Sequence, residues 1–209
     1  MDQVAADILT FWFGTTNMTE EIKKRDIWFK ATPEFDSALA GQFTEHHKKA
    51  AAGEFSGLKN TAEECLALVI ALDQFPRNLF RGSHEAFRSD EQARQTARHA
   101  LAQAFDMTVS TEPRKFFYLP FVHSENIEDQ DLAVERYSGF DDPKSLESAT
   151  GHREAIRRFG RFPHRNLALG RPNTSEEQEY LRIPPTWGMT AAEAADREIM
   201  LAEIEVQTT

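Results

Sequence analysis

Two short stretches of the sequence place arginine and asparagine within three residues after a Phe-Pro pair, and these side chains are suited to binding anions. The stretch 75–79 (FPRNL) is echoed by 162–167 (FPHRNL). A guanidinium group donates parallel hydrogen bonds to carboxylate or phosphate oxygens, and asparagine adds a neutral donor and acceptor. If the echo is structural, two equivalent loops at helix ends present Arg and Asn in similar ways.

The second stretch lies in a locally basic segment. Residues 157–171 hold five arginines and no acid, a charge of 5 − 0 = +5, whereas 125–142 hold one arginine and seven acids, 1 − 7 = −6. Such runs are typical of solvated helix faces that pair with each other. The alternative is that the arginine-rich loop binds a small anion.

Histidines are candidates for proton transfer beside such an anion. His123 and Gln130 lie at helical spacing from apolar neighbours, and so does His152 on the next predicted helix, so all three are expected to face inward. An inward histidine is often only a core residue. Together with His164 in the basic loop, however, these residues favour a polar pocket in which histidine acts as a general acid or base.

The candidate site follows from these patterns. His123 and His164 are the catalytic candidates, and the ligand-binding candidates are Arg77, Asn78, Arg81, Glu125, Gln130, His152, Arg161, Arg165, Asn166 and Arg171. Arg77, Arg161 and Arg165 would clamp the anion. We predict no metal and no cofactor, because the sequence has neither paired metal-ligand spacing nor a glycine-rich phosphate loop.

Helical periodicity predicts the elements that position these residues. The expected helices span 2–13, 20–29, 33–53, 62–75, 89–104, 111–121, 124–137, 144–159, 175–181 and 191–206. Pro76 is expected to end the fourth, and Ser89 with Gln92 forms a predicted capping box at the start of the fifth. No segment alternates apolar and polar residues for long enough to form a strand. The fold class is therefore all-α, with about nine or ten helices.

Composition sets the broad class. The chain has 209 residues and a formal charge of −10, and it shows no low-complexity linker, so a single helical domain over 1–209 is expected. The net charge argues against partners such as nucleic acid or an anionic membrane. The longest apolar run, 65–72, is too short to span a bilayer and begins with the lone Cys65, a predicted buried thiol. We therefore expect a cytoplasmic protein.

Three long blocks carry a resemblance to a known family. Residues 68–82, 116–130 (FFYLPFVHSENIEDQ) and 159–171 (FGRFPHRNLALGR) resemble the signature blocks of the bacterial domain of unknown function 924 family. The resemblance covers about 8–181 and implies a helical fold similar to tetratricopeptide-type right-handed superhelices. It implies no established activity, so no catalytic residue can be transferred. The C-terminal extension 182–209, which includes Trp187, departs from these blocks.

Three hypotheses remain open at this point. The first is a pocket for a small anionic molecule, with the question of catalysis undecided. The second is a helical module that binds a peptide or protein in a concave groove. The third is purely structural: the polar motifs form buried ion pairs, as Asp73 and Arg77 at i,i+4 would. We favour the first hypothesis over the second, and whether the three blocks converge on one concavity in the fold is the observation that tests it.

Overall fold

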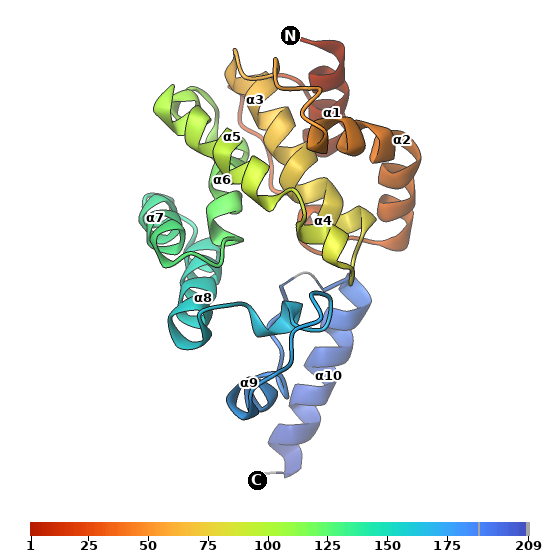
Figure 1. Ribbon diagram of the computed structural model, residues 1–209, viewed down its shortest axis with the longest axis vertical. Coiled ribbons are helices and arrows are strands. Elements are labelled where there is room, and N and C mark those ends of the chain that lie inside the picture. Colours follow the sequence, from red (N-terminus) through yellow and green to blue (C-terminus); the bar gives the residue numbers. More distant parts are fainter. Residues whose placement is uncertain (188, 208–209) are drawn as a thin grey trace.

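The structure is a computed structural model that describes residues 1–187 and 189–207, and in this part of the chain it contains helices and no strand (Figure 1). The α-helices are α1 Gln3–Phe13, α2 Pro33–Ala51, α3 Ala62–Val69, α4 Phe75–Leu79, α5 Asp90–Ala102, α6 Thr111–Val122, α7 Ile127–Ser138, α8 Pro143–Phe159, α9 Ser175–Tyr180 and α10 Ala191–Gln207. Short 3-10 turns are η1 Asp26–Trp28, η3 His84–Phe87, η4 Phe105–Thr108 and η5 Pro163–Arg165. For the described residues, the all-α prediction and the expected number of helices are confirmed.

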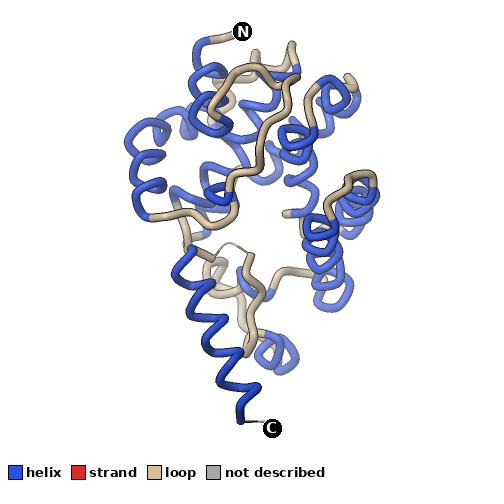
Figure 2. The backbone as a smooth tube through the Cα atoms, turned by 180° about the vertical axis from the view of Figure 1, so that it is seen from behind, coloured by secondary structure: helices blue, strands red, loops and turns tan. Residues whose placement is uncertain are grey.

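Successive helices pack against one another around α3. Helix α3 contacts α1, α5 and α6, and the chain then continues through the antiparallel neighbours α6, α7 and α8. Helices α9 and α10 lie at the far end, so the two chain termini stand at opposite ends of the molecule (Figures 1 and 2). The right-handed superhelix of the tetratricopeptide type stays a prediction. Within the described residues, no helix combines the length and apolarity needed to cross a bilayer.

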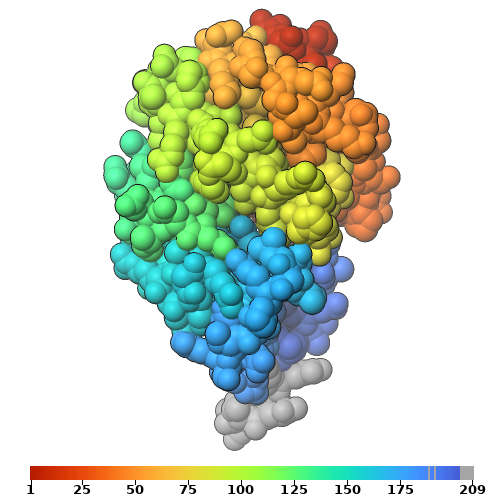
Figure 3. Space-filling view, in the orientation of Figure 1, coloured from red at the N-terminus to blue at the C-terminus, as the bar shows by residue number. Residues whose placement is uncertain are grey.

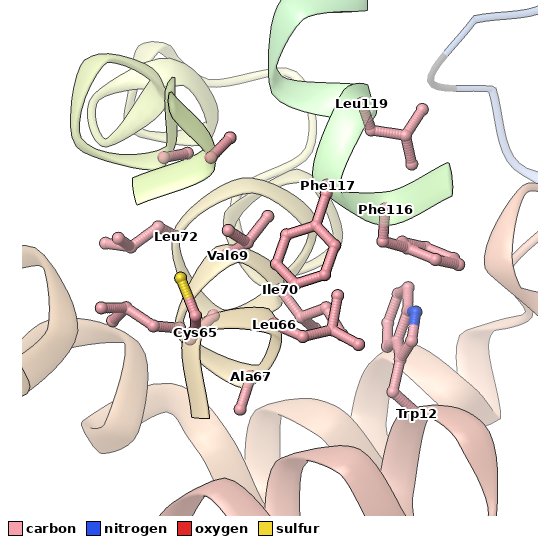
Figure 4. Close-up of a cluster of buried hydrophobic side chains, with 14 of the residues drawn as sticks. Trp12, Cys65, Leu66, Ala67, Val69, Ile70, Leu72, Phe116, Phe117 and Leu119 are labelled. Carbon is pink, nitrogen blue, oxygen red and sulfur yellow. The ribbon is translucent and has the colours of Figure 1, made fainter. Parts of the chain in front are cut away.

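From Cys65 onward helix α3 is buried on all sides, as the apolar run 65–72 predicts. Its residues meet the aromatic side chains of α1 and α6, where Trp12 and Phe116 pack edge to face with ring centroids 5.9 Å apart (Figure 4). The Cys65 thiol is fully buried and lies 3.6 Å from the Thr96 carbonyl of α5, and burial raises its pKa to about 12. The prediction of a buried thiol is confirmed, and a thiol that stays protonated at neutral pH is a poor nucleophile.

Pro76 does not end the central helix, contrary to the prediction. Residues Ile70–Gln74 form a single π-helical turn, η2, and the helix continues as α4 to Leu79. Pro76 lacks the N–H that would satisfy a carbonyl one turn earlier, which is why a break was expected. The helix survives because side chains from other elements satisfy the freed carbonyl groups.

Two such side chains, together with Arg77 of α4 itself, surround the π turn. His47 of α2 binds the Ala71 carbonyl at 2.9 Å, the Ser89 hydroxyl donates to the Leu72 carbonyl at 2.6 Å, and Arg77 donates to the Asp73 carbonyl. Single π turns occur frequently at functional sites because they redirect side chains. Here the turn places Asp73 and Gln74 in the interior.

Three further local predictions are wrong in detail. Residues 20–29 form only the turn η1, because Arg25 and Trp28 donate to the Trp12 carbonyl at the end of α1 and hold this segment away from helical geometry. Ser89 does not cap α5, since its hydroxyl is used on Leu72. Helix α7 begins at Ile127 rather than 124, because the Asn126 side chain accepts from the Glu128 N–H and caps it there.

Ser89→Ala therefore tests the support of the π turn. Removing the hydroxyl leaves the buried Leu72 carbonyl without this partner, and we expect the free energy of unfolding to fall by about 1–3 kcal/mol. Urea denaturation followed by circular dichroism measures it. Ser138→Ala is the matched control, since the Ser138 hydroxyl is exposed and donates only to Glu135 of its own helix. Equal losses of unfolding free energy in the two variants would show that the Ser89 hydroxyl does not support the π turn.

Candidate functional site

The three sequence blocks meet in one buried group of polar side chains. Asp73 comes from the π turn η2, Arg77 from α4, His123 from the end of α6 and Arg165 from η5, while Asp90 is the first residue of α5. We call these five residues the arginine–aspartate cluster. Figure 3 shows the segment after α8 lying directly against the segment around residues 80–90, which is where Arg165 meets Asp90.

Asp90 joins the two arginines of the cluster. Its carboxylate lies 3.0 Å from Nη1 of Arg77 and 3.4 Å from Nη1 of Arg165. Arg77 also lies 3.2 Å from the Asp73 carboxylate, and Arg165 Nη2 donates to the His123 carbonyl at 3.0 Å. With His123 neutral, the two arginines and the two aspartates of the cluster balance in charge. The cluster ties α4, α5, α6 and η5 together.

The sequence echo is partly structural. Arg77 and Arg165 occupy equivalent places in the two echoed stretches, and both bind the same carboxylate, Asp90. The two asparagines differ: Asn78 donates to Asp36 of α2, whereas Asn166 donates to the Asn173 side chain. The local conformations differ as well, because the first stretch is α-helical and the second is a 3-10 turn.

Asp73 and His123 form an oriented carboxylate–imidazole pair. His123 Nδ1 lies 3.0 Å from each Asp73 carboxylate oxygen. Burial alone would raise the pKa of Asp73, but Arg77 and His123 outweigh it and the net direction is downward, so the carboxylate is ionised and Nδ1 donates. Burial, followed by the charge of Arg77, lowers the pKa of His123. At neutral pH the imidazole is therefore uncharged, with its unprotonated nitrogen at Nε2.

Arg165 carries the least compensated charge of the cluster. Its guanidinium lies between the rings of Phe87 and Phe162, at 4.5 and 4.6 Å from their centroids, and burial lowers its pKa to about 10. In this region of the described structure, Arg165 Nε, Arg77 Nη2 and His164 Nδ1 are buried without a hydrogen-bond partner, as is Asp90 Oδ1. Buried nitrogens without partners are uncommon in folded proteins and call for an occupant.

An aromatic box adjoins the cluster. We use this name for His152 of α8, with Phe162 and His164 of the following loop, because the three rings surround Trp187. Trp187 stacks on His152 with centroids 3.7 Å apart, and its centroid lies 6.1 Å from Phe162 and 5.7 Å from His164. Burial is the main cause that lowers the pKa of His152 well below its usual value and that of His164 to about 3.

Box and cluster share a boundary. The His123 and His152 rings lie edge to face at 6.3 Å between centroids, and Phe162 touches both Arg165 and Trp187. The inward orientation predicted for His152 and Gln130 is confirmed by their burial. Both catalytic candidates, His123 and His164, therefore lie in or beside the same buried region.

Four predicted ligand-binding residues instead hold the loop after α8 in place. Arg171 forms a bidentate pair with Glu125 at 2.8 and 3.0 Å, and Glu125 also accepts from the Phe162 N–H. Asn166 accepts from Arg171 Nε. Arg161 forms a second bidentate pair, with Glu177 of α9 at 2.7 and 2.8 Å. Arg161 thus pairs with Glu177 outside the arginine–aspartate cluster, whereas Arg77 and Arg165 both lie in it.

Three other candidates are also engaged in structural contacts. Gln130 is fully buried, and its amide donates to the carbonyls of Val122 and Ser124 at 2.6 and 2.7 Å, which caps the end of α6. Asn78 and Arg81 both donate to Asp36 of α2, at 2.7 and 3.1 Å. These contacts position the helices that carry the cluster.

Sequence reasoning missed Asp90 and placed Trp187 outside the site. Asp90 is the first residue of a helix, where an acidic residue is common because it interacts favourably with the helix dipole. The presence of Asp at this position therefore did not indicate a second role. Trp187 gave no signal either, because it lies in the extension beyond the family-like blocks. A cue for Trp187 exists in Gly151, a glycine inside α8 whose added Cβ would stand 3.2 Å from the Trp187 ring.

Other parts of the structure offer less for chemistry. Across the described residues, no group of three or more His, Cys, Asp or Glu is placed to hold a metal ion. One open depression of about 530 Å³ lies between α1 and α2, lined by residues such as Phe11, Phe43 and His46. Another, of about 350 Å³, lies near Asp2 and Leu58. Neither is lined by a residue of the predicted site.

Comparison with known proteins identifies the family. The model of the family described as bacterial protein of unknown function (DUF924) matches residues 8–185. A solved structure of a protein of unknown function from Agrobacterium tumefaciens is 40% identical, superposes with a TM-score of 0.77, and matches over 85% of this chain and 96% of its own. Comparison with curated proteins gives no match. The chain therefore belongs to the DUF924 family of bacterial proteins of unknown function.

Proposed function

We propose that the arginine–aspartate cluster binds a small anionic ligand, with Arg165 as the principal contact. The observation that carries the proposal is the buried Arg165 guanidinium, whose Nε has no hydrogen-bond partner among the described residues. Arg77 Nη2 and His164 Nδ1 also lack a hydrogen-bond partner among the described residues. An anion with two or three oxygens would accept from these nitrogens, as carboxylates and phosphates do from arginine in proteins.

The charge around Arg165 supports an anion rather than a neutral ligand. The Arg165–Asp90 contact is long at 3.4 Å, and Asp90 divides its carboxylate between two arginines. The guanidinium carbon lies over two aromatic rings, Phe87 at 4.5 Å and Phe162 at 4.6 Å from the centroids. An anion at Nε would stabilise the charged form of Arg165, whose pKa burial lowers to about 10.

Proton transfer at this site would fall to His123. Its Nδ1 is held by Asp73, so a neutral His123 exposes the lone pair on Nε2, the arrangement in which a carboxylate orients a general base. His164 is the second candidate, with Nδ1 lacking a partner in the described structure. Its pKa of about 3 makes it a neutral group at physiological pH.

A peptide-binding module is the alternative. Its support is Leu167, which is 95% exposed on the loop between Phe162 and Arg171, with Leu169 nearby at 36%. Two leucines on one loop provide less apolar surface than a peptide groove across successive helices needs. We therefore favour the anion site.

Thermal unfolding with inorganic phosphate, oxalate and acetate tests the proposal. A ligand present at ten times its dissociation constant stabilises the folded state by about 1.4 kcal/mol, or about 3–6 °C in Tm for a chain of this size. We expect at least one of these anions to produce such a shift. We further expect Arg165→Lys to weaken binding at least tenfold, because lysine keeps the charge but loses the Nε–H and the planar fork.

Arg157→Lys is the matched control. Arg157 lies near the end of α8, half exposed, and contacts Asp131 and Glu154 at 3.4 and 3.5 Å outside the cluster. We expect it to leave the anion-induced shift unchanged. An anion that stabilises the chain and its Arg165→Lys variant equally would contradict the role of Arg165, and the absence of a shift with all three anions would contradict the anion site.

A further inference from the structure

The aromatic box is filled by a ring from outside the family region. His152, Phe162 and His164 lie within the matched residues 8–185, whereas Trp187 lies just beyond them. The family match thus includes the three rings of the box but not the ring that fills it. We propose that the box is a subsite for a planar aromatic ring, which makes the ligand an aromatic anion, and that Trp187 competes with that ring inside the molecule.

The shape of the box supports a flat ring. Trp187 lies nearly parallel to His152, with an interplanar angle of 25° and a centroid distance of 3.7 Å, while Phe162 and His164 meet it edge-on at 73° and 69°. Face contact on one side and edge contacts on two others are the preferred geometries of aromatic pairs. A puckered aliphatic ring would lose the stacked contact.

Gly151 gives the box its depth. It lies within α8, where glycine is a poor helix former, and a Cβ at this position would stand 3.2 Å from Trp187 Cζ2. The bare backbone thus lets a ring edge lie against the helix. Glycine at this position permits a close approach that a larger side chain would prevent.

The position of the box indicates where the charged group of the ligand would lie. His164 contributes both a ring to the box and a buried Nδ1 without a partner, and Phe162 contacts both Trp187 and the Arg165 guanidinium at 4.6 Å. A ligand whose ring occupies the box would direct a substituent toward Arg165. This inference rests on the proposed anion site and adds the aromatic part of the ligand.

Trp187 can leave without breaking hydrogen bonds to the box. The side-chain hydrogen bonds described for 184–197 are internal: Arg197 Nε donates to the Pro184 carbonyl at 2.6 Å, and Thr190 pairs with Glu193 at the start of α10. The Trp187 ring meets the box by packing alone, with intermediate exposure. An incoming ring would therefore exchange one packing contact for another.

Calorimetric titration of three matched probes tests the inference. Benzoate has a planar ring and a charge, benzamide the ring alone, and cyclohexanecarboxylate the charge with a puckered ring. With the full-length Trp187→Ala variant, we expect benzoate to bind at least tenfold more tightly than either other probe. Benzoate should also bind the Trp187→Ala variant at least tenfold more tightly than the unmodified chain. In the unmodified chain the box can accept a ring only while Trp187 lies outside it.

Two controls accompany the titration. Tyr180→Ala removes an aromatic ring that packs on Phe159 outside the box, at 4.9 Å, and we expect no gain in benzoate affinity. Gly151→Ala places a methyl group against Trp187 and should shift tryptophan emission to longer wavelength without ligand, since Trp12 and Trp28 stay in the core. This second variant favours its helix, so it keeps the test informative if Trp187→Ala does not fold.

The outcomes separate the two proposals. Equal binding of benzoate and cyclohexanecarboxylate, weakened by Arg165→Lys, would overturn the ring subsite and leave the anion site standing. Equal binding of benzoate and benzamide would support the ring subsite and overturn the anion site. No binding of any probe to a folded Trp187→Ala variant would overturn the ring subsite, while the anion site is decided by the phosphate, oxalate and acetate series. Unchanged emission in Gly151→Ala would overturn the placement of Trp187 in the box.

Discussion

Asp90→Ala is expected to lower the free energy of unfolding by about 3–5 kcal/mol, the range found when one partner of a buried ion pair is removed. Asp90 holds two arginines, Arg77 at 3.0 Å and Arg165 at 3.4 Å, and both guanidinium groups are largely buried. Without the carboxylate these two positive groups face each other away from water. This loss of charge compensation, rather than the loss of any single contact, causes most of the fall in the free energy of unfolding.

Urea denaturation at pH 7 measures the change, and Asp131→Ala is the matched control. Asp131 also faces two arginines, Arg153 at 3.7 Å and Arg157 at 3.4 Å, but its side chain is 52% exposed. An exposed pair contributes about 0–1 kcal/mol because water screens the charges. A loss in Asp90→Ala no larger than that in Asp131→Ala would show that Asp90 does not bear the two buried charges.

Lowering the pH from 7.5 to 5 is expected to destabilise the protein through its buried histidines. Burial is the leading cause that lowers the pKa of His47, His123, His152 and His164 below the ordinary 6.5. Below pH 6.5 the unfolded chain therefore binds protons that the folded chain does not, so stability falls as the pH falls. For His164, whose pKa is about 3, the loss at pH 5 is about 2 kcal/mol.

The pH window distinguishes histidines from carboxylates. Groups such as Asp73 and Glu177 have lowered pKa values, so their stabilising contribution is present above about pH 4.5 and is lost only below it. A loss between pH 6.5 and 5 thus reports the histidines.

Denaturation series at pH 7.5, 6.5, 5.5 and 5.0 measure this dependence. We expect His164→Gln to reduce the slope of stability against pH by about one proton, or about 1.4 kcal/mol per pH unit. The matched control is His84→Gln, since His84 is 65% exposed on η3. If His164→Gln leaves the slope of unfolding free energy against pH as unchanged as His84→Gln does, His164 is not buried in its neutral form.

Most helices follow from local rules that the sequence states directly. Thr32 and Pro33 begin α2, and Asp142 and Pro143 begin α8, in each case with the side chain of the first residue accepting from a backbone N–H. The inward faces of α7 and α8 were predictable as well, since apolar spacing identifies which side of a helix is buried. These features depend on residues at most a few positions apart.

The segments whose structure differs from the sequence prediction share a different cause. Pro76 is accommodated because His47 and Ser89, which lie 29 residues before and 13 after it, reach the freed carbonyls. Residues 20–29 are held out of a helix by bonds to Trp12. Long-range hydrogen bonds of this kind override local propensity, and the sequence alone does not reveal which distant side chain supplies them.

By itself the sequence determined the all-helical class, the family, the three polar blocks and the local excess of arginine around 157–171. Only the tertiary structure decided how those polar residues divide: Arg77 and Arg165 share Asp90, Arg161 and Arg171 bind Glu177 and Glu125, and Gln130 caps a helix. The physical reason is that periodicity reports burial along one helix. The choice of partner for a buried charge depends on helices packed from distant parts of the chain.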